Sequence, residues 1–580
     1  MDRRAFLKFA TPSAPKDPFP PAFRQASPPL LRIPPERAHQ FPFKFIEKAL
    51  SEYGEAAKNG SQDLAPLAIE AGLEVYGEAL ERVQAAHILR RTGFGGSPAD
   101  VQEVIGKSAD AVIDAIVDGA LAAPLPKPPA WADEGVPRNE DEQQIYLNER
   151  NPMWLVEYYA DLMRQLYHGG LRERMTLFWH NHFVTELEDY LIAPYAYRYV
   201  TTLHTHALGN FKDFVHAIGI ESAMLLYLNG IQNTAGQPNE NYARELCELF
   251  TMGQFDGKGN KNYTQPDIEE IARALTGWLV DPFELTVQLV FFRHDFGEKT
   301  IFGRTGHWGY DEVIDILFEE RAPQIAEFIA RKLYKEFIYA APDEDVVAEL
   351  AQVFLDNNFD IAPVVRALFK SAHFHDAQVV GAQIKSPISM MTGLLREAGA
   401  TPVEEHYLLF YVGGLVLGQR LLNPPNVAGW PGHHAWIDTG TLPTRWLASD
   451  FLVFGDNDVY PALDLVPASE TLLANSDGSI DPNNPTSVFT LAVLLAEHLM
   501  PVPLDTLDLH TPQDGFIGDL ANNPIPDEVL NGPAYAADLA KIFLLGQFPW
   551  YEWSLDHPLA PAVLMFYARN LAQYPEFQLT

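Results

Sequence analysis

The sequence predicts a mostly α-helical protein: a large multi-helix body with one small β element and long proline-rich loops. Along most of the 580 residues, apolar side chains recur at the three- and four-residue spacing of amphipathic helices. Only residues 286–293, with VQLVFF at their centre, have the composition of a strand. The 45 prolines gather in loops and near the ends of the chain, where they interrupt regular structure.

The charge of the chain excludes some classes of partner. The formal net charge is -36, from 41 Lys and Arg against 77 Asp and Glu. Nucleic acid and anionic lipid both need clustered basic residues, so we expect neither as a partner. The single cysteine, Cys247, excludes an internal disulfide and a cysteine-based zinc cluster. The longest apolar run, 407–417, is too short to cross a bilayer, so no transmembrane segment is predicted.

The N-terminus carries a motif of export signals. Residues 1–40 are proline-rich and predicted to form an extended arm. Arg3 and Arg4 lie in a string similar to a twin-arginine signal. Prolines follow at once, so the apolar region that such a signal requires is missing. The motif is either a degenerate signal or a chance match.

The rest of the chain divides by composition. We expect a helical core over 41–446, an acidic, loop-rich insertion over 447–556, and a C-terminal helix over 557–580 that returns to the core. From Trp446 to the end, 18 acidic residues face two basic ones, which predicts a solvated, peripheral surface.

Caps and stops predict the first helices. A helix over 81–91 ends at Gly93, and the SPAD sequence beginning at Ser97 resembles a capping box. Ser108 starts the next helix, and a linker follows at 124–137. Further helical patterns cover the segments 153–168, 264–277 and 311–395.

The stretch 171–190, LRERMTLFWHNHFVTELEDY, combines a helical apolar stripe with His180 and His182. Two residues apart on a helix, the two imidazoles point to different faces. Either both are structural, one of them hydrogen-bonded in the core, or at least one enters a polar pocket as a metal ligand or acid–base group.

The helix 239–253, NENYARELCELFTMG, carries Glu245 and Glu248 three residues apart. They are either border carboxylates in salt bridges or ligands that meet imidazoles from another helix. On the second interpretation, His180, His182, Glu245 and Glu248 hold a divalent metal.

The pair His294 and Asp295 directly follows the predicted strand and precedes glycine-rich chain, a common setting for site residues. Polar side chains embedded in apolar segments must find partners. The predicted catalytic set is therefore His180, His182, Glu245, His294 and Asp295. We expect His180 or His182 to share one pocket with Glu245 and with at least one of His294 and Asp295.

The loop 423–436, NPPNVAGWPGHHAW, is fixed by proline and glycine. Trp430, His433, His434 and Trp436 are predicted to bind substrate, with the rings stacking on sugars or covering a cleft. The alternative is a structural plug whose tryptophans belong to the core.

Several strings together resemble the bacterial domain-of-unknown-function 1800 family, over about residues 80–446 and the last helix. They are HILRRTGFG (87–95), MTLFWHNHF (175–183), NENYARELCELFTMG (239–253), YTQPDIEEIARALTGW (263–278), HDFGEKTIFGRTG (294–306), IKSP (384–387), GQRLLNPPNVAGWPGHHAWI (418–437) and PEFQ (575–578). The resemblance implies a mostly helical fold, often a twin-arginine signal, and a neighbouring gene for a sulfatase-like protein of the domain-of-unknown-function 1501 family. It implies no catalytic residues.

Two functions follow as hypotheses. The first is an exported enzyme with a His/carboxylate site and a divalent metal, a hydrolase or oxidoreductase acting on glycan or another cell-surface polymer. The second is a non-catalytic scaffold or partner of the sulfatase-like protein. A periplasmic or extracellular location follows from the resemblance, whereas the missing apolar region argues against it.

Overall fold

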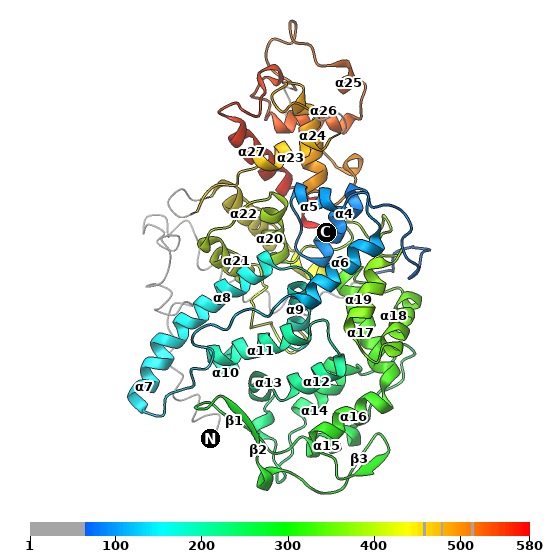
Figure 1. Ribbon diagram of the computed structural model, residues 1–580, viewed down its shortest axis with the longest axis vertical. Coiled ribbons are helices and arrows are strands. Elements are labelled where there is room, and N and C mark those ends of the chain that lie inside the picture. Colours follow the sequence, from blue (N-terminus) through cyan, green and yellow to red (C-terminus); the bar gives the residue numbers. More distant parts are fainter. Residues whose placement is uncertain (1–63, 456–459, 477–479, 512–514) are drawn as a thin grey trace.

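Helices make up 56% of the computed structural model, which describes residues 64–455, 460–476, 480–511 and 515–580. The prediction of a mostly α-helical protein is confirmed. Two small sheets lie at one end of the long axis and the C-terminal helices at the other (Figure 1). The arm 1–40, with Arg3 and Arg4, lies outside the described residues.

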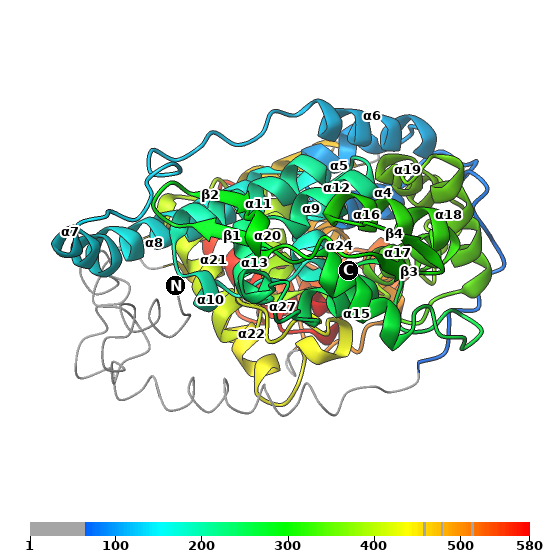
Figure 2. The ribbon, with the colours of Figure 1, turned by 90° about the horizontal axis from the view of Figure 1, so that it is seen from below.

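The first helices begin and end where local signals predict. Ser97 and Asp100 form the capping box, the Ser108 side chain caps α6, and Gly93 follows the last residue of α4. The start of α8 and the short α7 project from the body (Figures 1 and 2). The helices of this part are α4 (Arg82–Thr92), α5 (Pro98–Val104), α6 (Ala109–Ala122), α7 (Glu140–Ile145), α8 (Asn151–His168), α9 (Leu171–His182), α10 (Leu187–Tyr190), α11 (Ala193–His206), α12 (Phe211–Gly219), α13 (Ser222–Tyr227), α14 (Asn241–Glu245) and α15 (Gln265–Ala274).

Helix α9 lies at the centre of this body and packs against α6, α8 and α11. Its Trp179 is fully buried, and the indole N–H donates to the carbonyl of Ala207 at 2.9 Å. The predicted apolar stripe of this stretch is therefore the inner face of a core helix.

The predicted helix 239–253 is not a regular α-helix. It starts as α14, and residues Leu246–Thr251 then form a π-helical segment, η4, which ends before the left-handed Gly253 (φ 74°). A π-helical segment inserts an extra residue per turn, so the side chains beyond it are rotated from their expected positions. Cys247, the second residue of η4, is fully buried.

The strand predicted over 286–293 is shorter than expected. Its ordered part, β2, covers four residues, and a 3-10 turn at Phe291–Arg293 replaces the rest. Phe291 and Phe292 are 72% and 89% exposed, because this two-stranded ribbon at the surface buries neither side chain. Three unpredicted strands accompany it. The strands pair antiparallel as β1 (Trp278–Asp281) with β2 (Thr286–Leu289) and β3 (Lys299–Ile301) with β4 (Arg304–Gly306).

The helical pattern of 311–395 is present and continues beyond it. The helices are α16 (Tyr310–Glu320), α17 (Ala322–Phe337), α18 (Glu344–Asp356), α19 (Ile361–Lys370), α20 (Pro387–Glu397), α21 (Glu404–Val416) and α22 (Thr441–Phe454). Among them, α17 packs along α18, and α20 packs against α21 and α22.

The acidic segment contains helices with buried apolar faces, although its composition predicts mainly loops. Helix α24 packs against α23 and α26, and α27 packs against α22. The helices are α23 (Val466–Ala474), α24 (Ser487–Leu499), α25 (Asp527–Leu530), α26 (Ala534–Phe543) and α27 (Ala560–Ala572). The domain boundaries at 40, 446 and 556 stay predictions.

The last residues return to the body after the 3-10 turn Pro575–Gln578. The N–H of Lys385 donates to the carbonyl of Gln578 at 2.7 Å. The guanidinium of the fully buried Arg445 contacts the Gln578 side chain and the carbonyl of Lys385. The C-terminal turn and Arg445 of α22 thus both hold the backbone of Lys385, which lies just before α20.

Candidate functional site

His180 is a buried hydrogen-bond acceptor. Its Nε2 accepts the N–H of Leu422 at 3.0 Å, and its ring stacks on Trp430 at 5.3 Å with 8° between the planes. Burial lowers the pKa of His180 to about 4, so the ring is neutral. The imidazole thus connects α9 to the loop before Trp430.

His182 has both ring nitrogens engaged. Nε2 lies 3.0 Å from the carbonyl of Phe250, and Nδ1 lies 3.0 Å from the Lys332 ammonium. A carbonyl only accepts, so Nε2 carries the proton and Nδ1 accepts from Lys332. Burial and the Lys332 charge hold the pKa of His182 well below its usual value. This arrangement does not suit a metal ligand.

The two glutamates lie on the half-buried side of the α14–η4 segment. Glu248 accepts the phenolic O–H of Tyr263 at 2.6 Å. Burial raises the pKa of Glu245, and the neighbouring Glu248 adds to this. Among the described residues, no hydrogen bond joins either carboxylate to His180 or His182.

His294 and Asp295 bind the end of α15. The Nδ1 of His294 lies 2.8 Å from the carbonyl of Thr276, and Asp295 pairs with Arg273 at 2.8 Å. The hydrogen bond from Arg273 holds the pKa of Asp295 below its usual value. These contacts are structural.

The structure therefore does not bring the predicted catalytic set together, because each side chain has separate neighbours. In the described part of the chain, no three His, Cys, Asp or Glu side chains are grouped closely enough to hold a metal ion. Among the described residues, His180, His182, Glu245 and Glu248 form no shared metal site, and a bound divalent metal stays a prediction.

The loop 423–436 is pinned to α9. The Asn181 side chain accepts the N–H of Trp430 at 2.6 Å and donates to its carbonyl. Gly429 (φ 86°) passes so close that a Cβ there would lie 2.3 Å from Asn181 Oδ1. Trp430 and Trp436 are only 4% and 6% exposed, in agreement with the plug interpretation.

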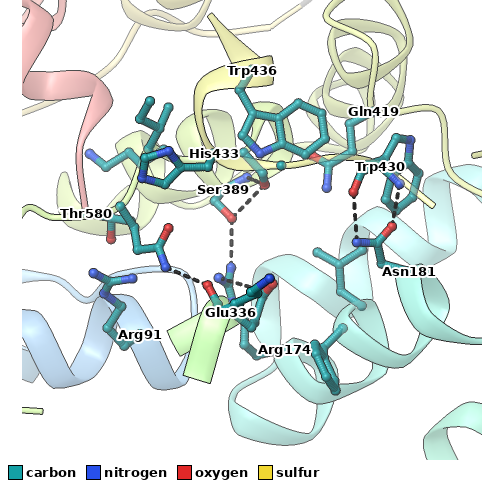
Figure 3. A pocket seen from close by; sticks show the side chains of 18 of the residues that line it. Arg91, Arg174, Asn181, Glu336, Ser389, Gln419, Trp430, His433, Trp436 and Thr580 are labelled. Carbon is teal, nitrogen blue, oxygen red and sulfur yellow. Dashed lines mark hydrogen bonds and ion pairs between the residues drawn. The ribbon is translucent and has the colours of Figure 1, made fainter. Parts of the chain in front are cut away.

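This loop also walls a cavity of about 450 Å³ between α4, α9, α17 and α20 (Figure 3). Trp430, His433 and Trp436 line it, whereas the exposed His434 does not. Of the predicted catalytic set, only His182 contributes to the lining. The charged side chains of the lining are those of Arg90, Arg91, Arg174, Lys332, Lys335, Lys385, Glu336 and Glu397.

Two of these cations are paired with the two carboxylates. Arg90 contacts Glu397 at 2.5 Å, and Arg174 contacts Glu336 at 3.0 Å. The other four, which we call the unpaired cations, form no ion pair with a carboxylate of a described residue. The unpaired cations are Arg91, Lys332, Lys335 and Lys385.

Several buried polar atoms of the cavity wall lack a partner among the described residues. They include Nε and Nη1 of Arg91, Nε of Arg174, Nζ of Lys385 and both ring nitrogens of His433. Burial lowers the pKa of Arg91 to about 9 and those of Lys332 and Lys385 to about 8. The cavity thus concentrates positive charge that the side chains of the described residues do not neutralise.

Sequence reasoning missed these cations because they come from separate parts of a strongly acidic chain. Arg91 lies in the string HILRRTGFG, Arg174 just before MTLFWHNHF, and Lys385 in IKSP. Basic residues within or next to the strings that resemble the family were the sequence feature that could have indicated this cationic cavity.

The fold and this site define a mostly α-helical protein with a buried cationic cavity. The chain belongs to the family described as "Protein of unknown function (DUF1800)", whose model matches residues 87–538. The match confirms the resemblance and spans most of the acidic segment. No curated protein and no solved structure matches the chain. Within the described residues, no helix is both long and apolar enough to span a membrane.

Proposed function

We propose that the protein binds a small anionic ligand in the cavity between α4, α9, α17 and α20. The observation that carries this proposal is the set of four unpaired cations, together with buried guanidinium and ammonium atoms that have no described partner. Removing a charge from water without a partner costs several kcal/mol. A ligand that brings negative charge into the cavity offsets this cost.

The cavity also indicates the kind of ligand. A volume of about 450 Å³ suits a small molecule or the end of a larger one. Asn181, Gln383 and Gln419 add carboxamides to the lining, and Trp430 and Trp436 add apolar surface. Carboxylate, phosphate and sulfate compounds fit this lining, including the acidic sugar of a glycan.

If the protein is a hydrolase or oxidoreductase acting on glycan or another cell-surface polymer, we infer that its substrate binds in this cavity. This hypothesis no longer rests on a shared site of His180, Glu245 and His294. The alternative of a scaffold for a sulfatase-like protein has no observation among the described residues in its favour.

Isothermal titration calorimetry with sulfate, phosphate and acetate tests the proposal. We expect saturable binding and a loss of roughly 10- to 100-fold in affinity for Arg91→Gln, since a hydrogen bond to a charged group contributes about 1.5–3 kcal/mol. Arg569→Gln is the matched control, because Arg569 pairs with Asp450 outside the cavity. No saturable binding of any anion, or equal losses in both variants, would refute the proposal.

A further inference from the structure

Lys385 presents a buried amine to the cavity without a hydrogen bond. Its side chain is 3% exposed, and Nζ has no partner among the described residues. The ammonium lies 4.2 Å from the centroid of the Phe577 ring. Contacts from Gln578 and Arg445 fix the backbone of Lys385, and its side chain lines the cavity.

Glu397 supplies the same cavity with a carboxylate oxygen that is also free. The residue is 2% exposed, its Oε1 accepts from Arg90, and its Oε2 has no described partner. Burial alone would raise the pKa of Glu397, but the charges of Arg90 and Lys385 hold it below its usual value. Glu397 is therefore an ionised proton acceptor that interacts electrostatically with Lys385 without forming an ion pair.

Lys332 offers a comparison within the same wall. Its ammonium donates to His182 Nδ1 at 3.0 Å and lies 3.4 Å from the carbonyl of Leu249. Those contacts occupy the amine of Lys332, whereas the amine of Lys385 forms no hydrogen bond with a described residue.

We propose that Lys385 is a nucleophile that forms an imine with the carbonyl carbon of an anionic aldehyde or 2-oxo acid bound in the cavity. This inference rests on the proposed function, because the unpaired cations would hold the anionic group of that compound. A desolvated lysine beside other cations is the usual setting of an imine-forming lysine.

The reaction is balanced without an oxidant or a reductant. The lone pair of the neutral amine forms the C–N bond, while the π pair of the carbonyl moves to its oxygen. Both protons of the amine pass in turn to that oxygen, for which the ionised Glu397 of the same cavity wall is the available base, and the oxygen leaves as water when the C=N bond forms. Burial lowers the pKa of Lys385 to about 8, so part of the amine is neutral near pH 7.5.

Trapping with glyoxylate and sodium cyanoborohydride tests this inference on the full-length protein. Hydride reduction of the imine leaves a carboxymethyl group, which intact mass and peptide mapping can locate. We expect one adduct, on Lys385, and protection by sulfate. Lys385→Arg, which keeps the positive charge, should abolish the adduct. Lys370→Arg, at a lysine outside the cavity that pairs with Asp110 and Asp114, should retain it, with circular dichroism reporting the fold of both variants.

The outcomes separate the two proposals. Sulfate binding without an adduct on Lys385, or labelling spread over exposed lysines, would overturn the imine inference and leave anion binding intact. An adduct on Lys385 without sulfate binding or protection would overturn the proposed anion site. Because the mapping is done on the wild-type chain, a variant that fails to fold does not prevent a decision.

Discussion

Replacing Lys385 by Met should make the empty protein more stable at neutral pH. Lowering the pKa from 10.5 to about 8 means that the folded state disfavours the charged amine. Each tenfold change in proton affinity is about 1.4 kcal/mol, so the penalty at pH 7 is about 3 kcal/mol. Methionine has a similar unbranched shape, fills the site and carries no charge.

The lowered pKa of Lys385 also determines how the stability of the wild type changes with pH. Well below pH 8 the lysine is protonated in both states, and the full penalty lowers the stability of the wild type. Between about pH 8 and 10.5 the unfolded chain binds more protons than the folded one, so wild-type stability rises with pH. The advantage of Lys385→Met should therefore be largest at pH 7 and approach zero near pH 10.5.

Thermal unfolding followed by circular dichroism at pH 7 and pH 10 measures this difference. Lys370→Met is the control, since Lys370 pairs with Asp110 and Asp114 at 2.5 and 2.8 Å and these bonds raise its pKa. We expect the control to lose up to about 1 kcal/mol. A lower Tm for Lys385→Met at pH 7, or a gain that does not change with pH, would refute the reasoning.

Three further predictions follow from the same contacts. Sulfate affinity should fall on the order of tenfold between pH 7 and pH 9.5, because Lys332 and Lys385 lose their charge above about pH 8 while sulfate keeps its charge. An affinity that calorimetry finds independent of pH would contradict this prediction. His180→Ala should lower the free energy of unfolding by about 1–3 kcal/mol, since the buried N–H of Leu422 loses its acceptor. Metal analysis of the wild type and this variant should show equal content, and a metal lost with His180 would support the metal hypothesis. Thr264→Ala should cost about 1 kcal/mol in thermal unfolding by removing a helix cap, and an unchanged Tm would count against that cap.

Local sequence signals predicted the helix ends well. Ser97, Ser108 and Thr264 cap the helices that they were expected to start, because a cap depends on four consecutive residues. The π-helical segment after Glu245 and the 3-10 turn at Phe291 were not predicted. Both depend on how the segment packs against distant chain, which helical periodicity or β propensity alone does not encode.

The sequence also did not predict which distant residues meet in the candidate site. His180, Glu245 and His294 were expected to meet because polar groups in apolar surroundings need partners. The partners they found are nearer and simpler: the N–H of Leu422 for His180, and the carbonyl of Thr276 for His294. Backbone groups are available along the whole chain, so a buried polar side chain does not by itself indicate a cluster.

A buried charged side chain without a partner is a better indication of a ligand site than one that forms an ion pair. Arg90 and Arg174 are neutralised within the wall, and on their own they would describe a structural network. Arg91 and Lys385 are just as buried and have no carboxylate partner among the described residues, although the chain carries 36 more negative than positive charges. The proposed anion site between α4, α9, α17 and α20 therefore rests on these unpaired cations of the described residues, and not on the histidine motif.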